Sequence, residues 1–332
     1  MLAQVVAGEH LSRAQARQAF ERIMAGEVDA PTLGAFLCAL ANKGEQVSEL
    51  VGAAEAMRQA ATKVRCARPC MCTCGTGGDG ISTFNVSTTA AIIASAAGAV
   101  VAKHGNRTNT RVSGSSEVLA ELGVNIDAEA PVLERCLVEV GLAFLHAPNL
   151  HPAMRHAVGV RRAIRSRTIF NLLGPLCNPA GASRQVLGVS RPEHVDLMAG
   201  ALAELGAERA WVVHGADGLC DLSVTGASQV AELSGGVVRR MAVHPADVGL
   251  PPAPLPELLV ESAARSATVV RAILDGERGP QRDHALLNAG AALVVYGIVG
   301  ELREGVELAG KAIDDGRARA QLARLVELSH GG

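Results

Sequence analysis

Apolar residues recur three and four positions apart through the first 65 residues of the chain. Over the stretches 11–28, 30–44 and 48–64 this spacing is typical of amphipathic helices that bury one face. Ser48 opens the third stretch and is a candidate N-cap, because its hydroxyl can accept a hydrogen bond from a free N–H of the first turn. The pattern predicts a small helical unit at the start of the chain.

From Pro69 the pattern changes to short apolar runs that end in glycine or polar turns. The runs at 71–75, 184–190 and 209–215 are predicted strands, and helical stretches alternate with them. The chain returns to helical periodicity after a proline-rich surface connection at 250–260. Strands that alternate with helices predict an α/β fold. We expect a small helical N-terminal domain and a larger domain with a central, mostly parallel sheet flanked by helices, with bounds 1–67, joined by part of 155–185, and 68–332.

Composition and charge indicate a small-molecule partner. The 332 residues include 31 Lys and Arg against 33 Asp and Glu, and aromatic residues make up 2%. No basic field or aromatic platform is therefore available for nucleic acid. The N-terminus lacks the apolar core of a cleavable signal, and no run of 18 apolar residues predicts a membrane span. We expect a cytoplasmic protein without a membrane partner, whose eight cysteines stay reduced.

Two polar clusters follow the first predicted strands. The run GTGGDGISTFNVSTTA, 75–90, places three glycines and then hydroxyl and amide groups at the start of a helix, which favours phosphate. A tight strand-to-helix connection would look the same, because the run is neither a Walker loop nor a GxGxxG fingerprint. One helix later Lys103, His104, Asn106 and Arg107 precede a Ser-Gly-Ser-Ser run. This second anion cradle makes a solvated loop the weaker interpretation.

Two further clusters are charged. Arginines recur at 155, 161, 162, 165 and 167, a pattern that is also typical of a solvated helix face. The run VVHGADGLCDLSVTG ends a predicted strand in a turn with Asp217 and Asp221. Carboxylates in such a turn can hold Mg²⁺ through bound water.

Taken in order, these motifs resemble the anthranilate phosphoribosyltransferase family over nearly the whole chain. The matching runs are GTGGDG, TFNVST, KHGNR, SGSSEVLAELG, HPAM, VRRAIRSRTIFNLLGPLCNPAG, QVLGV, VVHGADGL and GERGPQRDHALLNAGAAL. The resemblance implies a homodimer whose active site lies in the cleft between the two domains. It also implies that anthranilate attacks C1 of phosphoribosyl pyrophosphate (PRPP) and releases pyrophosphate, a step of tryptophan biosynthesis.

The resemblance further assigns residues to each substrate. The implied PRPP-binding positions are Gly75, Gly78, Asp79, Thr83, Asn85, Ser87, Thr88, Lys103, Asn106 and Ser115. The implied anthranilate-binding positions are Gly75, His104, Asn106, Ala147, His151, Arg161, Gly174 and Pro175. The implied Mg²⁺ positions are Ser87, Asp221 and Cys220. No residue is assigned as a catalytic acid or base, because the reaction depends mainly on positioning and charge stabilisation.

The chain departs from the family pattern in three places, one of which is the run LLVESAARS, 258–266, where the family usually has a glycine-rich turn and an acidic residue. An Asp-Glu pair normally stands where this chain has Cys220 and Asp221, and a thiol is a poor ligand for Mg²⁺. We therefore expect Mg²⁺·PRPP to be held through Ser87 and the pyrophosphate, with weaker support from Asp221. Asn109, Arg111 and Val112 replace small hydroxyl residues and a Lys.

The cysteines before the glycine run raise a separate question. Cys70, Cys72 and Cys74 alternate along a predicted strand, so their side chains share one face. Free cysteine packs in cores as a small apolar residue. Together with Cys66 they match no paired CxxC spacing, so packing is favoured over a zinc site.

Other functions remain alternatives at this stage. A PRPP-dependent paralogue with a different aromatic acceptor, or a catalytically impaired relative, fits the change at Cys220, whereas Arg161 and His151 favour anthranilate. Pyrimidine nucleoside phosphorylases share the fold, but the KHGNR and RTIFNLLGPL runs favour the transferase. A silent or nucleic-acid-binding relative is disfavoured by the near-complete PRPP set and by the net charge of −2.

Overall fold

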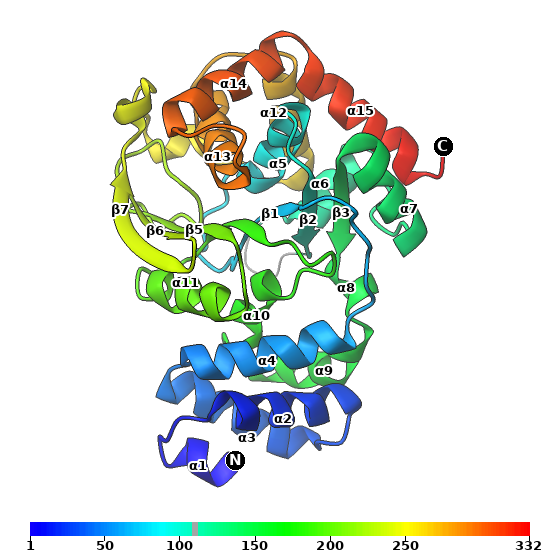
Figure 1. Cartoon of the computed structure of the whole chain (residues 1–332), viewed down its shortest axis with the longest axis vertical. Coiled ribbons are helices and arrows are strands. Elements are labelled where there is room, and N and C mark those ends of the chain that lie inside the picture. Colours follow the sequence, from blue (N-terminus) through cyan, green and yellow to red (C-terminus); the bar gives the residue numbers. More distant parts are fainter. Residues whose placement is uncertain (108–111) are drawn as a thin grey trace.

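The structure is a computed structural model that describes residues 1–107 and 112–332. The departures at Asn109 and Arg111 therefore lie outside the described residues. The chain begins with four helices, α1 (Leu2–Val6), α2 (Arg13–Ala25), α3 (Ala30–Lys43) and α4 (Val47–Ala60). They form the lowest layer in Figure 1, where α9 (Arg155–Ile164) packs against α2 and α3. A segment from far along the chain thus completes this helical unit.

The start of α4 corrects one prediction. Ser48 is not the N-cap, since the helix begins at Val47 and Gln46 is the capping residue. Glu49 Oε2 accepts the Gln46 backbone N–H at 2.9 Å. Ser48 instead donates its hydroxyl to Leu11 O at 2.8 Å, a tertiary contact that outweighs the local preference.

A seven-stranded sheet forms the middle layer, in the order β3-β2-β1-β4-β5-β6-β7. The five strands from β3 to β5 are parallel, and β6 and β7 extend the sheet as an antiparallel pair. The hairpin at β6 and β7 was not predicted from the sequence. The strands are β1 (Met71–Gly75), β2 (Val101–Gly105), β3 (Leu142–His146), β4 (Arg184–Gly188), β5 (Arg209–Gly215), β6 (Ser228–Ser234) and β7 (Val237–Val243).

Helices cover both faces of the sheet (Figure 1). The upper face and the β3 edge carry α5 (Val86–Ala96), α6 (Ser115–Glu121), α7 (Ala130–Arg135), the π-helical turn η1 (Cys136–Val140), α12 (Ala263–Leu274), α13 (Pro280–Tyr296), α14 (Leu302–Asp314) and α15 (Arg317–Ser329). The lower side carries α8 (Ala147–Leu150), η2 (Pro152–Met154), α10 (Phe170–Leu176) and α11 (His194–Glu204). Two short 3₁₀ turns, η3 (Pro245–Val248) and η4 (Leu255–Leu258), lie in the proline-rich connection.

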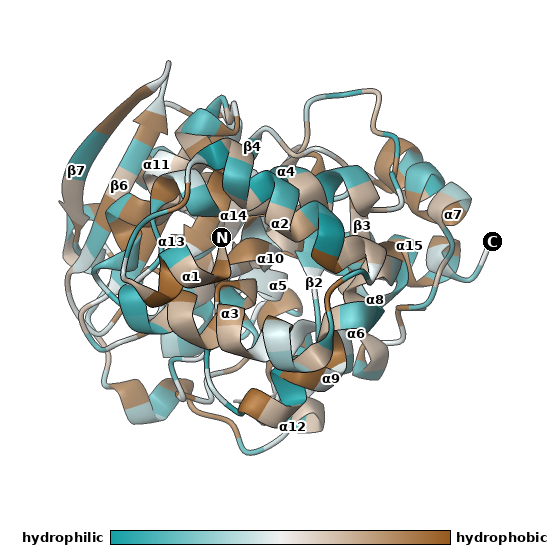
Figure 2. Ribbon diagram, turned by 90° about the horizontal axis from the view of Figure 1, so that it is seen from below, coloured by the Kyte–Doolittle hydropathy of each residue, from teal (hydrophilic) through white to brown (hydrophobic). Residues whose placement is uncertain are grey.

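Buried apolar residues form two clusters, one on each face of the sheet. Trp211 and Val213 of β5 belong to the upper cluster, while Val212 belongs to the lower one. The lower cluster continues through Met198 to Leu37 in α3, so one apolar core joins the sheet to the helical unit. In Figure 2 the helices of this unit carry both hydrophilic and hydrophobic segments, as amphipathic helices do. No helix in the described part of the chain is long and apolar enough to cross a membrane.

Candidate active site

A cavity of about 270 Å³ opens at the carboxyl ends of β1, β2 and β5. Strands β2 and β3 lie on one side of β1, and β4 and β5 lie on the other. In open α/β sheets ligands bind in the crevice that forms where the strand order changes direction in this way. Residues of α6, α9 and α10 complete the walls of the cavity.

The glycine loop after β1 forms one wall. Gly77 and Gly78 have φ of +59° and +81°, a left-handed conformation that favours glycine. A Cβ at Gly78 would also overlap the guanidinium of Arg167. That guanidinium donates from Nη1 to Gly77 O at 2.8 Å, so the loop is tied to the segment before α10. Close backbone approach, rather than a short connection alone, explains the glycines.

Lys103 is a buried cation that lines the cavity. Its side chain is buried, and Nζ donates to Thr73 O at 2.8 Å and to Ser87 Oγ at 3.1 Å. Burial lowers the pKa of Lys103, while the charges of Cys72 and Asp221 oppose that shift. An ammonium has three N–H donors, so the described partners leave one for an anion.

Helix α5 adds donors beside Lys103. Asn85 caps the helix, with Oδ1 accepting the Thr88 N–H at 3.2 Å, and both Asn85 and Ser87 line the cavity. The N-terminus of a helix carries a partial positive charge that favours anions. Ser115, at the start of α6, lines the opposite side, and a Cβ at Gly105 would overlap its hydroxyl.

Two histidines lie below this phosphate-like half of the cavity. His104 Nδ1 is 3.1 Å from Gly174 O, which can only accept, so Nδ1 carries the proton. His104 Nε2 is then an acceptor for His151 Nε2, 3.2 Å away. Burial lowers the pKa of His104 to about 3 and that of His151 to about 4. Both rings are neutral near pH 7, and their facing nitrogens are used by each other.

Arg161 lines the same end of the cavity. Its guanidinium carbon lies 5.2 Å from the centre of the Phe170 ring, and burial lowers its pKa. A cation over an aromatic face is held in orientation without an ion pair. Its planar donors therefore stay available for a carboxylate in the cavity.

The loop after β5 brings Cys220 and Asp221 to the cavity. A Cβ at Gly188 would overlap Cys220 O, so only glycine in β4 lets the loop pass this closely. Asp217 points elsewhere, because its Oδ2 accepts the hydroxyls of Ser223 at 2.5 Å and Thr225 at 2.7 Å. The expectation of a metal role for Asp217 gains no support from these contacts.

The donor set near Asp221 fits Mg²⁺ only with help from a ligand. Among the described residues, no group of three or more His, Cys, Asp or Glu side chains could hold a metal ion. Ser87 and the Asp221 carboxylate both line the cavity and supply hard oxygens. Mg²⁺ is commonly bound by one or two carboxylates together with substrate phosphates. The residues present therefore fit a metal that arrives with its phosphates.

Two family models match the chain. One, described as "Glycosyl transferase family, a/b domain", matches residues 67–319, and the other, "Glycosyl transferase family, helical bundle domain", matches residues 1–61. An anthranilate phosphoribosyltransferase from Anaeromyxobacter dehalogenans is 51% identical over 98% of this chain and 96% of its own length. One from Moorella thermoacetica is 47% identical over the same shares. The chain belongs to the anthranilate phosphoribosyltransferase family.

Solved structures of the family share the fold throughout. The anthranilate phosphoribosyltransferase of Thermus thermophilus superposes with a TM-score of 0.94 at 41% identity, covering 99% of both chains. The Saccharomyces cerevisiae enzyme in complex with PRPP and Mg superposes with a TM-score of 0.88 at 25% identity, covering 97% of this chain and 94% of that one. The predicted fold class is therefore confirmed.

The structure brings most of the sequence-predicted positions into one cavity. Those that line it are Gly75, Gly78, Asn85, Ser87, Lys103, His104, Asn106, Ser115, Arg161, Gly174, Pro175, Cys220 and Asp221. They come from separate segments between Gly75 and Asp221, yet the strand order places them together. Their roles in binding stay predictions.

The other predicted positions lie outside the lining. Asp79 stabilises loops, since its carboxylate accepts the backbone N–H groups of Ile81 at 3.4 Å and Cys220 at 3.3 Å. Thr83 and Thr88 are buried, one at a bridge beside Leu259 and the other within α5. The Asp79 contacts favour support of the loop, whereas the hydroxyls of Thr83 and Thr88 have no hydrogen-bond partner among the described residues, so their binding roles stay predictions.

Ala147 and His151 are not among the residues that line the cavity. Ala147 is the first residue of α8, and His151 reaches the cavity only through its contact with His104. Binding roles for these two positions remain predictions, and His151 would act on a ligand through His104.

Several residues that line the cavity were missed from the sequence. Arg167 belonged to a run interpreted as a solvated helix face, but only Arg155, Arg162 and Arg165 are exposed in that way. Cys74, Ser113, Phe170 and Asn171 also line the cavity. The RTIFNLLGPL run was the available signal for Arg167, Phe170 and Asn171, since it matched the family without any residue being singled out.

The strand cysteines combine packing with polar contacts. Cys70, Cys72 and Cys74 are buried, as predicted. Cys72 Sγ accepts the His104 backbone N–H at 3.3 Å, and Gln185 donates to Cys74 Sγ at 3.0 Å. A hydrogen bond from Cys74 and the nearby Lys103 ammonium lower the pKa of Cys72. These thiols therefore also support the floor of the cavity.

The neutral histidine pair predicts a defined loss of stability in acid. The unfolded chain protonates histidine near pH 6.5, whereas the folded pKa values are about 3 and 4. As pH falls below 6.5, the free energy of unfolding should fall by about 1.4 kcal/mol per pH unit for each histidine. Proton NMR between pH 7.5 and 5 should show the ring signals of His104 and His151 unmoved. The variants His104→Asn and His151→Asn identify which signals belong to which ring. A titration midpoint near pH 6.5 for either ring would contradict the lowered pKa values.

Proposed function

We propose that this chain transfers the phosphoribosyl group of PRPP to the amine of anthranilate, giving N-(5-phosphoribosyl)anthranilate and pyrophosphate for tryptophan biosynthesis. One observation carries the proposal. A single cavity joins a phosphate-like half, around Lys103, Asn85 and Ser87, to a slot with a cation and neutral rings, Arg161 and His104. The relatives named as anthranilate phosphoribosyltransferases favour anthranilate over a different aromatic acceptor.

Charge separation at C1 is the difficulty that the phosphate half addresses. Breaking the C1–O bond leaves positive charge on the ribose and negative charge on the departing pyrophosphate. The Lys103 ammonium and the N-terminus of α5 are fixed and desolvated, so they stabilise that negative charge without reorganising. Mg²⁺, held by Ser87 and Asp221 together with the phosphates, would neutralise further negative charge on the leaving group.

The slot at the other end positions the acceptor. The Arg161 guanidinium is suited to two parallel hydrogen bonds with the anthranilate carboxylate, which fixes the ring and aims the amine. Both ring nitrogens of His104 are used, by Gly174 O and by His151, and His151 does not line the cavity, so neither presents a lone pair to the amine. They act as positioning groups, and the amine loses its proton after the new bond forms.

We further propose that the enzyme is a cytoplasmic homodimer, as the family resemblance implies. The described cysteines form no disulfide, which suits a reducing compartment. Val6 of the helical unit and Val158 of α9 are exposed apolar residues available for a partner protomer. A mass of one protomer in light scattering would count against the dimer.

Anthranilate fluorescence tests the activity directly. Purified protein with PRPP and millimolar Mg²⁺ should consume anthranilate steadily, and consumption should stop when PRPP is left out. Arg161→Lys keeps the charge but loses the planar donor pair, so KM for anthranilate should rise by about 10- to 100-fold. KM for PRPP should change by less than about twofold, since Arg161 belongs to α9 of the helical unit, whereas Lys103 and Ser87 belong to β2 and α5.

Arg162→Lys is the matched control, because Arg162 is the exposed neighbour in the same helix. It should leave both constants unchanged. No PRPP-dependent consumption by the wild type would overturn the proposed function, and equal effects of the two substitutions would overturn the role of Arg161.

The metal loop gives a second prediction. Cys220→Asp adds a hard carboxylate beside Asp221, so half-maximal activity should need roughly tenfold less free Mg²⁺ or lower. Calorimetric titration of Mg²⁺ in the presence of pyrophosphate should show the same tightening without turnover. Cys220→Ser, which adds an oxygen but no charge, is the control and should stay near the wild type. Coincident curves for wild type and Cys220→Asp would show that position 220 does not support the metal.

A further inference from the structure

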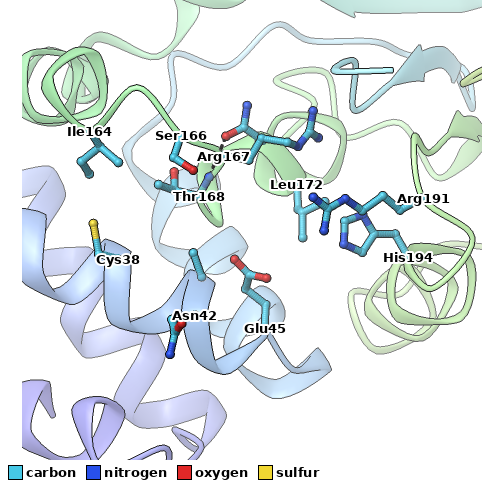
Figure 3. A pocket seen from close by; sticks show the side chains of 12 residues that line it. Cys38, Asn42, Glu45, Ile164, Ser166, Arg167, Thr168, Leu172, Arg191 and His194 are labelled. Carbon is cyan, nitrogen blue, oxygen red and sulfur yellow. Dashed lines mark hydrogen bonds between the residues drawn. The ribbon is translucent and has the colours of Figure 1, made fainter. Parts of the chain in front are cut away.

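A second cavity, of about 360 Å³, lies beside the active site. Figure 3 shows it between α3 of the helical unit, which supplies Cys38, and the start of α11, which supplies His194. The segment before α10 closes it from above. No residue that the sequence assigned to either substrate lines it.

This cavity is lined by two polar groups that have no hydrogen-bond partner in the part of the chain that the structure describes. Thr168 is 4% exposed, and its hydroxyl has no hydrogen-bond partner among the described residues. The backbone N–H of Thr168 is satisfied by Asn171 Oδ1 at 2.9 Å, so only the hydroxyl is left over. His194 Nδ1 is also buried and unpartnered within the described chain. A buried polar group without a partner is costly, which indicates a ligand or bound water here.

The charges around the cavity favour an anion. Arg191 and Arg167 line it with one carboxylate, Glu45. Arg191 meets Glu193 only at 3.8 Å, in an exposed pair that contributes little. His194 begins α11, an 11-residue helix whose N-cap side chain makes no capping bond, so the positive helix end faces the same side. Burial raises the pKa of Glu45.

Arg167 and Asn171 lie at the boundary of the two cavities, and Arg167 also reaches the glycine loop. Both residues line both cavities, and Arg167 Nη1 donates to Gly77 O in the glycine loop of the active site. A ligand in the second cavity would therefore lie one side chain away from the pyrophosphate loop.

We propose that the second cavity binds a small phosphoryl oxyanion, held by Arg191, Thr168 and His194 at the start of α11. Two sources of such an anion share this chemistry: inorganic phosphate from solution, and pyrophosphate released in the active site. The second source rests on the proposed function, whereas the site itself does not.

Calorimetric titration of metal-free protein with sodium pyrophosphate, and separately with sodium phosphate, tests the site without PRPP or anthranilate. The wild type should bind two equivalents of pyrophosphate. Arg191→Ala should lose one of them, with at least tenfold weaker affinity, and Lys103→Met should lose the other. Thr168→Val, which keeps the shape but removes the hydroxyl, should weaken the same equivalent as Arg191→Ala. Arg265→Ala, an exposed arginine of α12, is the charge-matched control and should bind like the wild type.

The variant Glu45→Gln tests whether the ligand of the second cavity is an anion or a zwitterion such as an amino acid. Removal of the carboxylate should tighten binding of an oxyanion severalfold, while weaker binding would overturn the proposal. Unchanged stoichiometry in Arg191→Ala would overturn it too. If the equivalent lost in Arg191→Ala binds phosphate more tightly than pyrophosphate, the ligand is phosphate from solution. If it binds pyrophosphate more tightly, the ligand is the reaction product. Because no substrate is present, failure of the site and failure of the proposed activity give different results.

Discussion

The rest of the site depends on one buried ammonium group, that of Lys103. Removing the Lys103 ammonium from water is costly. Its burial is tolerated because Thr73 O and Ser87 Oγ accept hydrogen bonds from it and because Cys72 and Asp221 lie near it. The described partners leave a third N–H of Lys103, which lines the cavity. The strand β2 fixes this side chain at the crossover point of the sheet, so an anionic ligand completes an arrangement that the fold has already prepared.

The cavity also requires other groups to approach the backbone closely, and this requirement explains three glycines. Gly188 lets the loop with Cys220 and Asp221 cross β4, Gly78 leaves room for the Arg167 guanidinium, and Gly105 leaves room for Ser115. A side chain at Gly188 would separate β4 from the loop with Cys220, whereas one at Gly78 or Gly105 would displace the Arg167 guanidinium or the Ser115 hydroxyl. The same closeness couples the glycine loop, the metal loop and the segment before α10 into one unit, through Asp79 and Arg167.

The sequence predicted what is encoded locally. The glycine run, the alternation of strands with helices and the Lys103 to Arg107 cluster have strong local patterns, and the fold class followed from them. The contact of His104 with His151 was beyond reach, since it joins residues 47 positions apart through the end of β2 and the start of η2. Arg167 resembled its exposed neighbours because only the tertiary approach of Gly77 distinguishes it. The β6–β7 hairpin was missed because the exposed face of β7 carries arginines and lacks the apolar run used to find strands.

Calorimetric titration of Mg²⁺·PRPP into wild type and Lys103→Met, without anthranilate, tests the central claim most directly. If the buried ammonium organises the cavity for an anion, the variant should remain folded by circular dichroism and bind at least about 100-fold more weakly, a difference of about 2.7 kcal/mol. Affinity within a few-fold of the wild type in a folded variant would contradict this account, and would shift the anchoring of PRPP to the helix α5 terminus and the glycine loop.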